Sequence, residues 1–308
     1  MHNRLLDRFP GVIGFPVTPF DGDDNLDEAA FSSNVDFLMA SELAALAFCG
    51  SNGELQSLTL DEYRRVVSLA GAKIAGQKGF ICGVGQTLHN ACDQARAARE
   101  AGAEAVIVMA PYSNDLSEQG LADYYRRVAG AAEIPCFLYQ TKWSGVLPLT
   151  LLDRLTGVEG IQMVKDEHGS LSHYLNVRTA FGDRFHWING MAEPFVPAYW
   201  NLGVRTFTSG LACFAPQTAI RILRLAEASD FPAINQLLND VVVPLYKLRN
   251  RRPGYKCSMI KTAMTLCGLA GGRVRAPLIE MSSEDRADLD ALLERTGVKE
   301  AVKASALA

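Results

Sequence analysis

Eight short apolar runs recur along the first 207 residues of the chain. They lie at Val12–Val17, Ala44–Cys49, Phe80–Val84, Ala105–Met109, Cys136–Tyr139, Ile161–Val164, Phe185–Ile188 and Val204–Phe207. Each run is almost continuously apolar, and several are rich in Val, Ile and Phe. Strands that are buried on both faces of a parallel sheet have this pattern. The runs therefore predict eight buried parallel strands.

Segments with helical periodicity separate these runs. They lie at Leu26–Ala40, Leu60–Ala75, Leu88–Ala101, Leu116–Ala131, Pro148–Thr156, Leu171–Phe181, Glu193–Leu202 and Pro216–Ala228. Thr59 and Glu62 form a capping-box pattern at the start of one helix, and Gly102 follows another as a stop signal. Eight β-then-α units predict a closed (β/α)8 TIM barrel. An open doubly wound sheet is disfavoured because the chain lacks its glycine-rich nucleotide fingerprint.

The pattern changes after residue 228. Three helical segments follow with no strand between them, at Phe231–Leu248, Lys256–Cys267 and Ser283–Arg295. The sequence therefore predicts a catalytic barrel domain over residues 1–228 and a C-terminal helical region over residues 229–308. We expect the last eight residues, which are small and mostly apolar, to be frayed.

Composition narrows the class of protein. The 308 residues are 48% hydrophobic and 21% charged, which is typical of a globular chain that can bury a large core. The net charge is −4 and there is no basic stripe, so we expect no nucleic-acid partner. No apolar run reaches the length of a membrane span, so we expect no membrane partner. The seven cysteines are scattered without a C-x-x-C pair, which favours reduced thiols, a cytoplasmic location and no structural zinc.

The ends of the predicted strands are where a barrel of this kind carries its chemistry. Lys165 directly follows the sixth run. Desolvation there would lower the pKa of its amine and make it a nucleophile for a carbonyl, although a strand-end lysine can also simply extend into solvent. Tyr139 ends the fifth run, one strand away. It could relay protons beside that amine, or it could be an ordinary aromatic residue of the barrel rim.

A polar glycine loop follows the second run, at residues 50–54. Gly50 and Gly53 would let a ligand approach the backbone closely, while Ser51 and Asn52 add donors that suit a carboxylate. The alternative is an ordinary turn between a strand and a helix. The sequence contains no metal-binding motif and no Walker A motif, so we expect neither a metal nor a phosphate-binding loop of that type.

Five segments together resemble a known family. They are Gly14-Phe15-Pro16-Val17-Thr18-Pro19-Phe20, Gly50-Ser51-Asn52-Gly53-Glu54, Ala110-Pro111-Tyr112, Tyr139 and Val164-Lys165-Asp166. In this order and spacing, the chain resembles the dihydrodipicolinate synthase / N-acetylneuraminate lyase superfamily of class I aldolases from Gly11 to about residue 295. These enzymes form a Schiff base with their substrate. The resemblance thus implies the same barrel and a lysine imine, with no separate cofactor.

The resemblance also implies roles for individual residues. Lys165 matches the Schiff-base lysine, and Tyr139 matches the tyrosine that relays protons and positions the keto acid. Gly50, Ser51 and Asn52 match the loop that holds the substrate carboxylate. Asn52 stands where the family usually has threonine, so its geometry differs while it still donates a hydrogen bond.

Two departures argue against dihydrodipicolinate synthesis. The loop after Tyr139, residues 140–145, lacks the arginine that grips the second substrate of that enzyme. Ser113 replaces the second of two adjacent tyrosines, which completes a proton relay across a subunit contact. Lys142 in that loop could instead pair with the distal carboxylate of a diacid, or it could be simply solvated.

The C-terminal half is similar to another branch, the 5-dehydro-4-deoxyglucarate dehydratases. Three segments carry this similarity, at Leu248-Arg249-Asn250-Arg251, Pro253-Gly254-Tyr255 and Arg273-Val274-Arg275-Ala276-Pro277-Leu278. That branch favours G-G-T-G-E and Y-N-R-D-N, whereas this chain has G-S-N-G-E and Y-Q-T-K-W. The arginines in these segments could equally be solvated residues at helix ends, without a role in substrate binding. The resemblance therefore implies that the chain is related to this branch, but it does not identify the substrate.

These expectations point to a lyase that acts on a 2-keto acid, either a 2-keto-3-deoxy sugar-acid dehydratase or an aldolase. Condensation of pyruvate with an aldehyde, as in 4-hydroxy-tetrahydrodipicolinate synthase, is an alternative. A catalytically silent keto-acid-binding homologue is another. Ser209, in the short Thr208-Ser209-Gly210 segment, is a further candidate for substrate contact, although this segment is too short to indicate a phosphate-binding enzyme. The family commonly forms tetramers built from dimers, so we expect a homo-oligomer.

Overall fold

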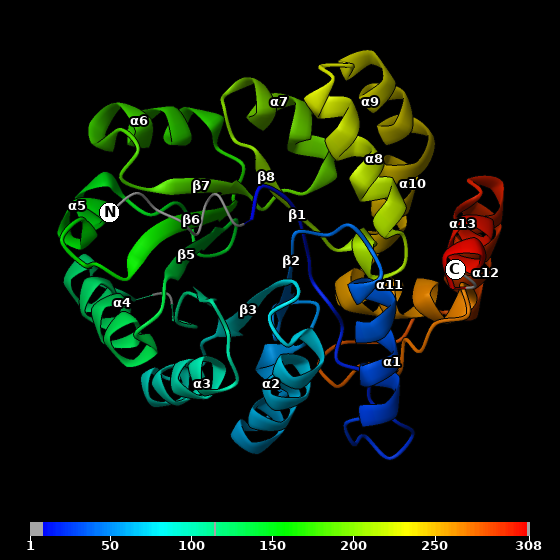
Figure 1. Cartoon of the computed structure of the whole chain (residues 1–308), viewed down its shortest axis with the longest axis horizontal. Helices are drawn as coiled ribbons and strands as arrows, with labels where there is room; N and C mark the ends of the chain where they lie inside the picture. Colours follow the sequence, from blue (N-terminus) through cyan, green and yellow to red (C-terminus); the bar gives the residue numbers. More distant parts are fainter. Residues whose placement is uncertain (1–8, 114, 307–308) are drawn as a thin grey trace.

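The computed structural model describes residues 9–113 and 115–306, and its strands form a closed barrel (Figure 1). All neighbouring strands run parallel in the order β1 to β8, and β8 pairs with β1. The strands are β1 (Gly11–Gly14), β2 (Ala45–Phe48), β3 (Gly79–Val84), β4 (Ala105–Val108), β5 (Cys136–Thr141), β6 (Ile161–Glu167), β7 (His186–Asn189) and β8 (Thr206–Ser209). The predicted (β/α)8 barrel is confirmed, with each predicted run lying on one strand.

Helices follow the strands and ring the barrel (Figure 1). They are α1 (Glu28–Met39), α2 (Leu60–Ile74), α3 (Leu88–Glu100), α4 (Glu118–Ala132), α5 (Leu149–Leu155), α6 (Leu171–Phe181), α7 (Val196–Asn201) and α8 (Pro216–Glu227). The capping box at α2 is confirmed, because the Thr59 hydroxyl accepts from the Glu62 amide while the Glu62 carboxylate accepts from the Thr59 amide. The helix expected at Glu193–Leu202 instead begins with a 3₁₀ turn, since Pro194 and Pro197 interrupt the ladder of amide donors.

Strands β5 and β6 extend farther than their apolar runs. Tyr139 and Lys165 were expected at strand ends, but β5 continues to Thr141 and β6 to Glu167. The two strands are paired over this extension, with Tyr139 directly opposite Lys165. Paired backbone groups keep polar residues in the strand here, which hydropathy alone does not reveal. The extension carries polar side chains up into the mouth of the barrel.

The C-terminal region is helical, as expected. It contains α9 (Phe231–Leu237), α10 (Val243–Arg249), α11 (Tyr255–Leu266), α12 (Ser283–Arg295) and α13 (Val298–Ala306). In Figure 1, α12 and α13 stand outside α11 at the edge of the molecule. The division at residue 228 stays a prediction, although the last barrel helix ends at Glu227.

The helix expected at Phe231–Leu248 is confirmed, and it contains a wide π-type turn over Leu238–Val242, just before Pro244, whose ring cannot donate to the helical ladder. One expectation for this region was wrong. The tail expected to be frayed forms α13, because Val298 and Val302 are buried against the rest of the region. Residues 307 and 308 of that tail lie outside the described residues.

All seven cysteines are free thiols, and six of them are buried. No helix in the described part of the chain is long and apolar enough to cross a membrane.

Candidate active site

Lys165 and Tyr139 meet inside the mouth of the barrel. The Lys165 side chain is only 6% exposed, and its Nζ lies 3.8 Å from the centre of the Tyr139 ring. The Phe15 ring lies on another side, 5.1 Å from the same atom. Burial lowers the pKa of the Lys165 amine below its ordinary value, although the neighbouring Glu167 carboxylate opposes this shift. The structure thus holds a desolvated amine with a reduced affinity for its proton.

Glu167 is the third member of this cluster, and the sequence interpretation missed it. Its Oε2 accepts a hydrogen bond from the Tyr139 hydroxyl and a second one from Lys165 Nζ at 3.1 Å. Burial by itself would raise the pKa of Glu167, but Lys165 and the Tyr139 hydrogen bond outweigh burial and hold this pKa below its usual value. The period of two along a strand could have revealed it, because residues 165 and 167 project from the same face.

The pKa of the Tyr139 hydroxyl is shifted in the opposite direction from that of Glu167. Burial raises its pKa well above the ordinary value, and the charge and hydrogen bond of Glu167 raise it further. Hydrogen bonding to Ser51 offsets this only in part. Tyr139 is therefore a neutral phenol in the resting site, whereas Glu167 is ionised.

The loop at residues 50–54 also reaches this cavity. Ser51 and Asn52 line it, and the Asn52 amide donates to the Phe15 carbonyl at 3.3 Å. Gly50 is buried behind them rather than in the lining. Gly53 is required by packing, because a Cβ there would stand 2.9 Å from the Cys49 amide nitrogen. The loop thus presents two polar side chains to the cavity from a tightly packed turn.

Glu54 anchors this loop to the C-terminal helices. Its carboxylate is fully buried and accepts from Lys261 Nζ of α11 at 2.5 Å and from the Arg275 amide at 3.0 Å. The Cys257 thiol, also on α11, donates to the Asn52 carbonyl at 3.1 Å. The glutamate of the motif therefore has a structural contact, and the helical region sets the position of the loop.

The cavity above Lys165 has a volume of about 480 Å³. Three cationic side chains line it: Lys142 after β5, and Arg249 and Lys256 from the helical region. Within the described residues, none of the three forms an ion pair. Arg249 has one hydrogen bond, from its Nε to the Lys256 carbonyl at 3.2 Å. Sequence reasoning singled out Lys142 but left Arg249 as an undecided helix end, because only the fold brings α10 over the barrel.

Ser209 lies elsewhere than expected. Its side chain is fully buried, donates to Glu193 and accepts from the Ala212 amide at 2.9 Å. Its neighbours Thr208 and Gly210 line the cavity instead. The alternation of side chains along β8 explains this, because adjacent residues face opposite sides of a strand. A direct contact of Ser209 with substrate stays a prediction, with Glu193 as its observed partner.

Comparison with known proteins agrees with the family resemblance found in the sequence. A family model, the dihydrodipicolinate synthetase family, matches residues 8–296. A probable 5-dehydro-4-deoxyglucarate dehydratase of Ralstonia nicotianae is 34% identical over 288 residues, which cover 92% of each chain. One from Oceanobacillus iheyensis is 29% identical and covers 94% of this chain and 95% of its own. The chain belongs to the dihydrodipicolinate synthetase family.

Solved structures agree with this assignment. The crystal structure of dihydrodipicolinate synthase from Bacillus clausii superimposes with a TM-score of 0.88 at 27% identity, covering 94% of this chain and 98% of that one. Together with the dehydratase-named relatives, this makes the chain a lyase of the class I aldolase type. The resemblance found in the sequence is confirmed.

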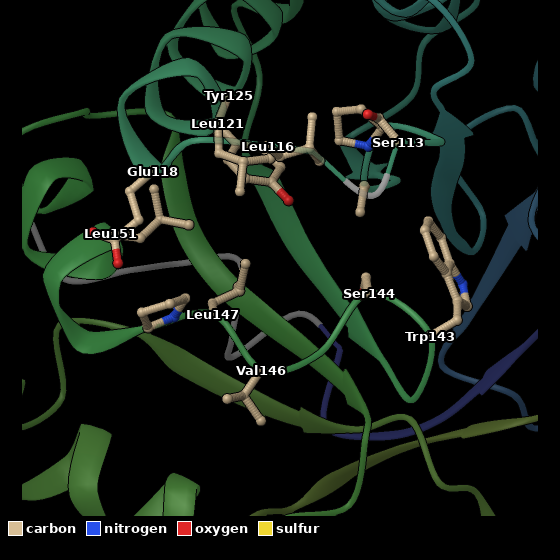
Figure 2. Close-up of a pocket in the computed structure, with 13 residues that line it drawn as sticks. Ser113, Leu116, Glu118, Leu121, Tyr125, Trp143, Ser144, Val146, Leu147 and Leu151 are labelled. Carbon is tan, nitrogen blue, oxygen red and sulfur yellow. The ribbon is translucent and has the colours of Figure 1, made fainter.

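A second hollow of about 300 Å³ lies beside the candidate site of this family member (Figure 2). It is framed by the segment that carries Ser113 and Leu116 and by the loop that carries Trp143 and Leu147. Trp143 lines both cavities and stacks on Tyr112, with ring centres 5.5 Å apart. Ser113, the residue that departs from the family pattern, is thus placed in the side hollow and outside the lining of the Lys165 cavity.

Metal ligation has no obvious place in this family member. In residues 9–113 and 115–306, no three His, Cys, Asp or Glu side chains are grouped so that they could hold a metal ion. Asp166, next to Lys165, is fully buried and occupied: it accepts from Gln140 at 2.9 Å and from the His168 amide at 2.9 Å. It therefore braces β5, β6 and the following turn instead of facing the cavity.

Proposed function

We propose that this lyase dehydrates a 2-keto-3-deoxy sugar acid, as the name of its 5-dehydro-4-deoxyglucarate dehydratase relatives suggests. The observation that carries the proposal is the buried Lys165 amine, with Tyr139 and Glu167 in contact and three cations around the same cavity. Lys165 attacks the C2 carbonyl of the keto acid and forms a protonated imine. The imine draws electrons from C3, so that no metal or organic cofactor is needed.

Binding of the keto acid involves both ends of the molecule. Ser51 and Asn52 hold the C1 carboxylate beside Lys165, since their donors line the cavity there. Lys142, Arg249 and Lys256 attract a carboxylate at the distal end, because none of them is paired with an acid of the described chain. A substrate with two carboxylates thus suits this cavity better than pyruvate plus an uncharged aldehyde. Tyr139 relays protons while the imine forms at Lys165.

Borohydride trapping tests the imine. With pyruvate and borohydride, we expect mass spectrometry to find a reduced adduct on Lys165 and no adduct in Lys165→Ala. An adduct on a different lysine, or none, would contradict the assignment. This experiment also separates the lyase from a homologue that does not form an imine.

Product mass distinguishes the reactions. With a panel of 2-keto-3-deoxy sugar acids, we expect loss of water from diacids, either alone or together with carbon dioxide. Release of pyruvate would indicate an aldolase instead, and an imine without turnover would indicate a silent keto-acid binder. Arg249→Gln should raise the KM for a diacid more than for the matching monoacid, while Arg286→Gln, on the outer helix α12, serves as the control.

The oligomeric state of the chain and its location in the cell are also part of its proposed function. We propose that the chain works as a homo-oligomer, a tetramer or a dimer, as its family membership supports. Light scattering after size-exclusion chromatography tests this, and a monomer at working concentration would contradict it. The seven free thiols support action in the cytoplasm.

A further inference from the structure

Two tyrosine–glutamate pairs belong to this one cavity. The first joins Tyr139 of β5 to Glu167 of β6. The second joins Tyr246 of α10 to Glu193, in the turn that follows β7, with 2.7 Å between the Tyr246 hydroxyl and Glu193 Oε2. Tyr246 lines the cavity, whereas Glu193 is fully buried behind it. The barrel therefore supplies one pair, and the barrel and the helical region together supply the other.

The surroundings of the two carboxyl groups differ. Glu167 lies beside the Lys165 ammonium, which favours its ionised form and lowers its pKa. Among the described residues, no cation contacts Glu193 directly, and burial raises its pKa despite hydrogen bonds from Ser209 and Tyr246. A pair of carboxyl groups whose environments separate their proton affinities supplies a base and an acid at the same pH.

We propose that Glu167 removes the C3 proton of the imine and that Tyr246, backed by Glu193, protonates the departing C4 hydroxyl. This division of labour rests on the proposed function, because it needs a substrate that carries a hydroxyl at C4. Glu167 and Tyr246 are then catalytic residues, and Glu193 is a positioning residue that acts through Tyr246.

The contacts around Lys165 favour Glu167 over Tyr139 as the base. Tyr139 already donates its proton to Glu167, and burial keeps that phenol neutral. Glu167 Oε2 stands 3.1 Å from Lys165 Nζ, the atom that becomes the imine nitrogen. Because C3 is only two bonds from that nitrogen, a carboxylate at this distance can reach a C3 hydrogen without leaving its place.

Tyr246 is suited to donate the proton that the departing C4 hydroxyl takes up. In the structure the Tyr246 hydroxyl donates to Glu193 Oε2 at 2.7 Å. Once Glu193 is protonated, its carboxylic O–H can donate to the phenolic oxygen instead, which frees the phenolic proton to face the cavity. Glu167 and Tyr246 line the same cavity, so both groups can act on one bound substrate. Arg249 lies over the Tyr246 ring, 5.4 Å from its centre, and can hold an anionic substrate end near this acid.

In this elimination every proton and every electron pair has a donor and an acceptor. Glu167 takes the C3 proton, the C3–H electron pair forms the C2=C3 bond, and the C2=N pair moves onto nitrogen. The resulting enamine re-forms C2=N, makes C3=C4 and breaks the C4–O bond. Tyr246 gives its proton to the leaving oxygen and takes one from Glu193, so water departs. The proton on Glu167 returns to Glu193 through solvent, and no oxidant or reductant is used.

Exchange of the methyl protons of pyruvate in D2O tests the base without any sugar acid. We expect the parent protein to exchange these protons through the Lys165 imine. Glu167→Gln should slow the exchange by about 10²–10⁴-fold. Borohydride trapping of pyruvate in Glu167→Gln verifies that its imine still forms. Exchange at the parental rate in a Glu167→Gln protein that forms the imine would overturn the assignment of the base.

Matched controls remove similar groups that do not line the cavity. Glu28→Gln removes a surface carboxylate that pairs with Arg65 on α2. Tyr255→Phe removes another phenol that donates to a carboxylate, Asp285, at 2.8 Å. Both controls should exchange pyruvate protons as the parent does, which separates loss of the base from a general effect of the substitution.

Elimination from 5-dehydro-4-deoxyglucarate in D2O tests the acid. We expect Tyr246→Phe and Glu193→Gln to lose water at least about tenfold more slowly, while deuterium enters C3 of the unreacted substrate. Deuterium enters because the enamine is still formed but returns to substrate. Water loss at the parental rate in Tyr246→Phe would overturn its role. If the parent itself loses no water, the role of Tyr246 falls together with the proposed function, while pyruvate exchange still decides the role of Glu167.

Discussion

Two buried lysines of this molecule have different surroundings: one lines the large cavity, and the other is held by buried partners. Lys165 on β6 points into the barrel mouth, while Lys261 on α11 is enclosed between the helical region and the loop at residues 50–54. Their side chains are almost equally hidden, at 6% and 1% exposure. Burial alone therefore does not distinguish a reactive amine from a structural one.

The partners of the two amines make the difference. Lys261 donates to Glu54 at 2.5 Å and to the Arg273 carbonyl, and it also lies 4.6 Å from the centre of the Phe20 ring. Lys165 has a single carboxylate contact, at 3.1 Å, and open space above it. A buried lysine whose hydrogen-bond donors all have partners is costly to replace but chemically inert. A buried lysine that faces a cavity can lose its proton and attack a substrate carbonyl.

Replacement of Lys165 should have the largest effect on activity. We expect Lys165→Met to reduce turnover by about 10⁴-fold or more, since the covalent intermediate is lost. Stability should fall less than in a Lys261 variant, because the Glu167 carboxylate loses its cation but is 31% exposed to solvent. Kinetics and urea unfolding measure the two effects. A substantial residual rate would show that the imine is not central.

Replacement of Lys261 should have the reverse effect. Lys261→Met leaves the Glu54 carboxylate buried without its cation, so the free energy of unfolding should fall by about 3–5 kcal/mol. Folded protein should still trap pyruvate on Lys165. Adding Glu54→Gln to Lys261→Met should recover part of the stability, because the unpaired charge is removed. If Lys261→Met unfolds like the parent, the structural role of this pair is wrong.

The pH dependence of imine trapping sharpens the contrast further. Only the neutral amine attacks, so the trapping rate should rise with pH through the lowered pKa of Lys165 and level off above it. Glu167 raises this pKa against the effect of burial. Its replacement by Gln should therefore move the rising limb to more acidic pH. A shift of the rising limb toward alkaline pH would contradict the conclusion that Glu167 raises the pKa of Lys165.

A change in the loop between the two lysines should have the smallest effect. Asn52→Ala removes the amide that lines the cavity but leaves Glu54 and Lys261 in place. A hydrogen bond of about 1 kcal/mol corresponds to roughly a fivefold weaker binding of pyruvate. Isothermal titration in the Lys165→Met background measures binding without the imine. Unchanged affinity would show that Ser51 or backbone groups alone hold the carboxylate.

The order of elements in the barrel was readable from the sequence. Eight apolar runs alternate with helical segments, and local hydropathy together with backbone hydrogen bonding decides such elements over short distances. Lys165 and Tyr139 were found in the same way, because Lys165 directly follows an apolar run and Tyr139 ends one. The family motif then identified their loop partner, Ser51 and Asn52. These features depend on neighbours close in sequence or on a recognisable spacing.

Contacts between distant segments were decided by the tertiary structure alone. Glu54 and Lys261 are 207 positions apart, and Glu193 and Tyr246 are 53 apart, so no local pattern indicates either pair. Arg249 reads as a helix end until the fold lays α10 over the barrel mouth. The sequence by itself thus determined the barrel and its lysine. Which cations of the helical region stand over that lysine, and which acid contacts Tyr246, depended on how this region packs, because charges act through space rather than along the chain.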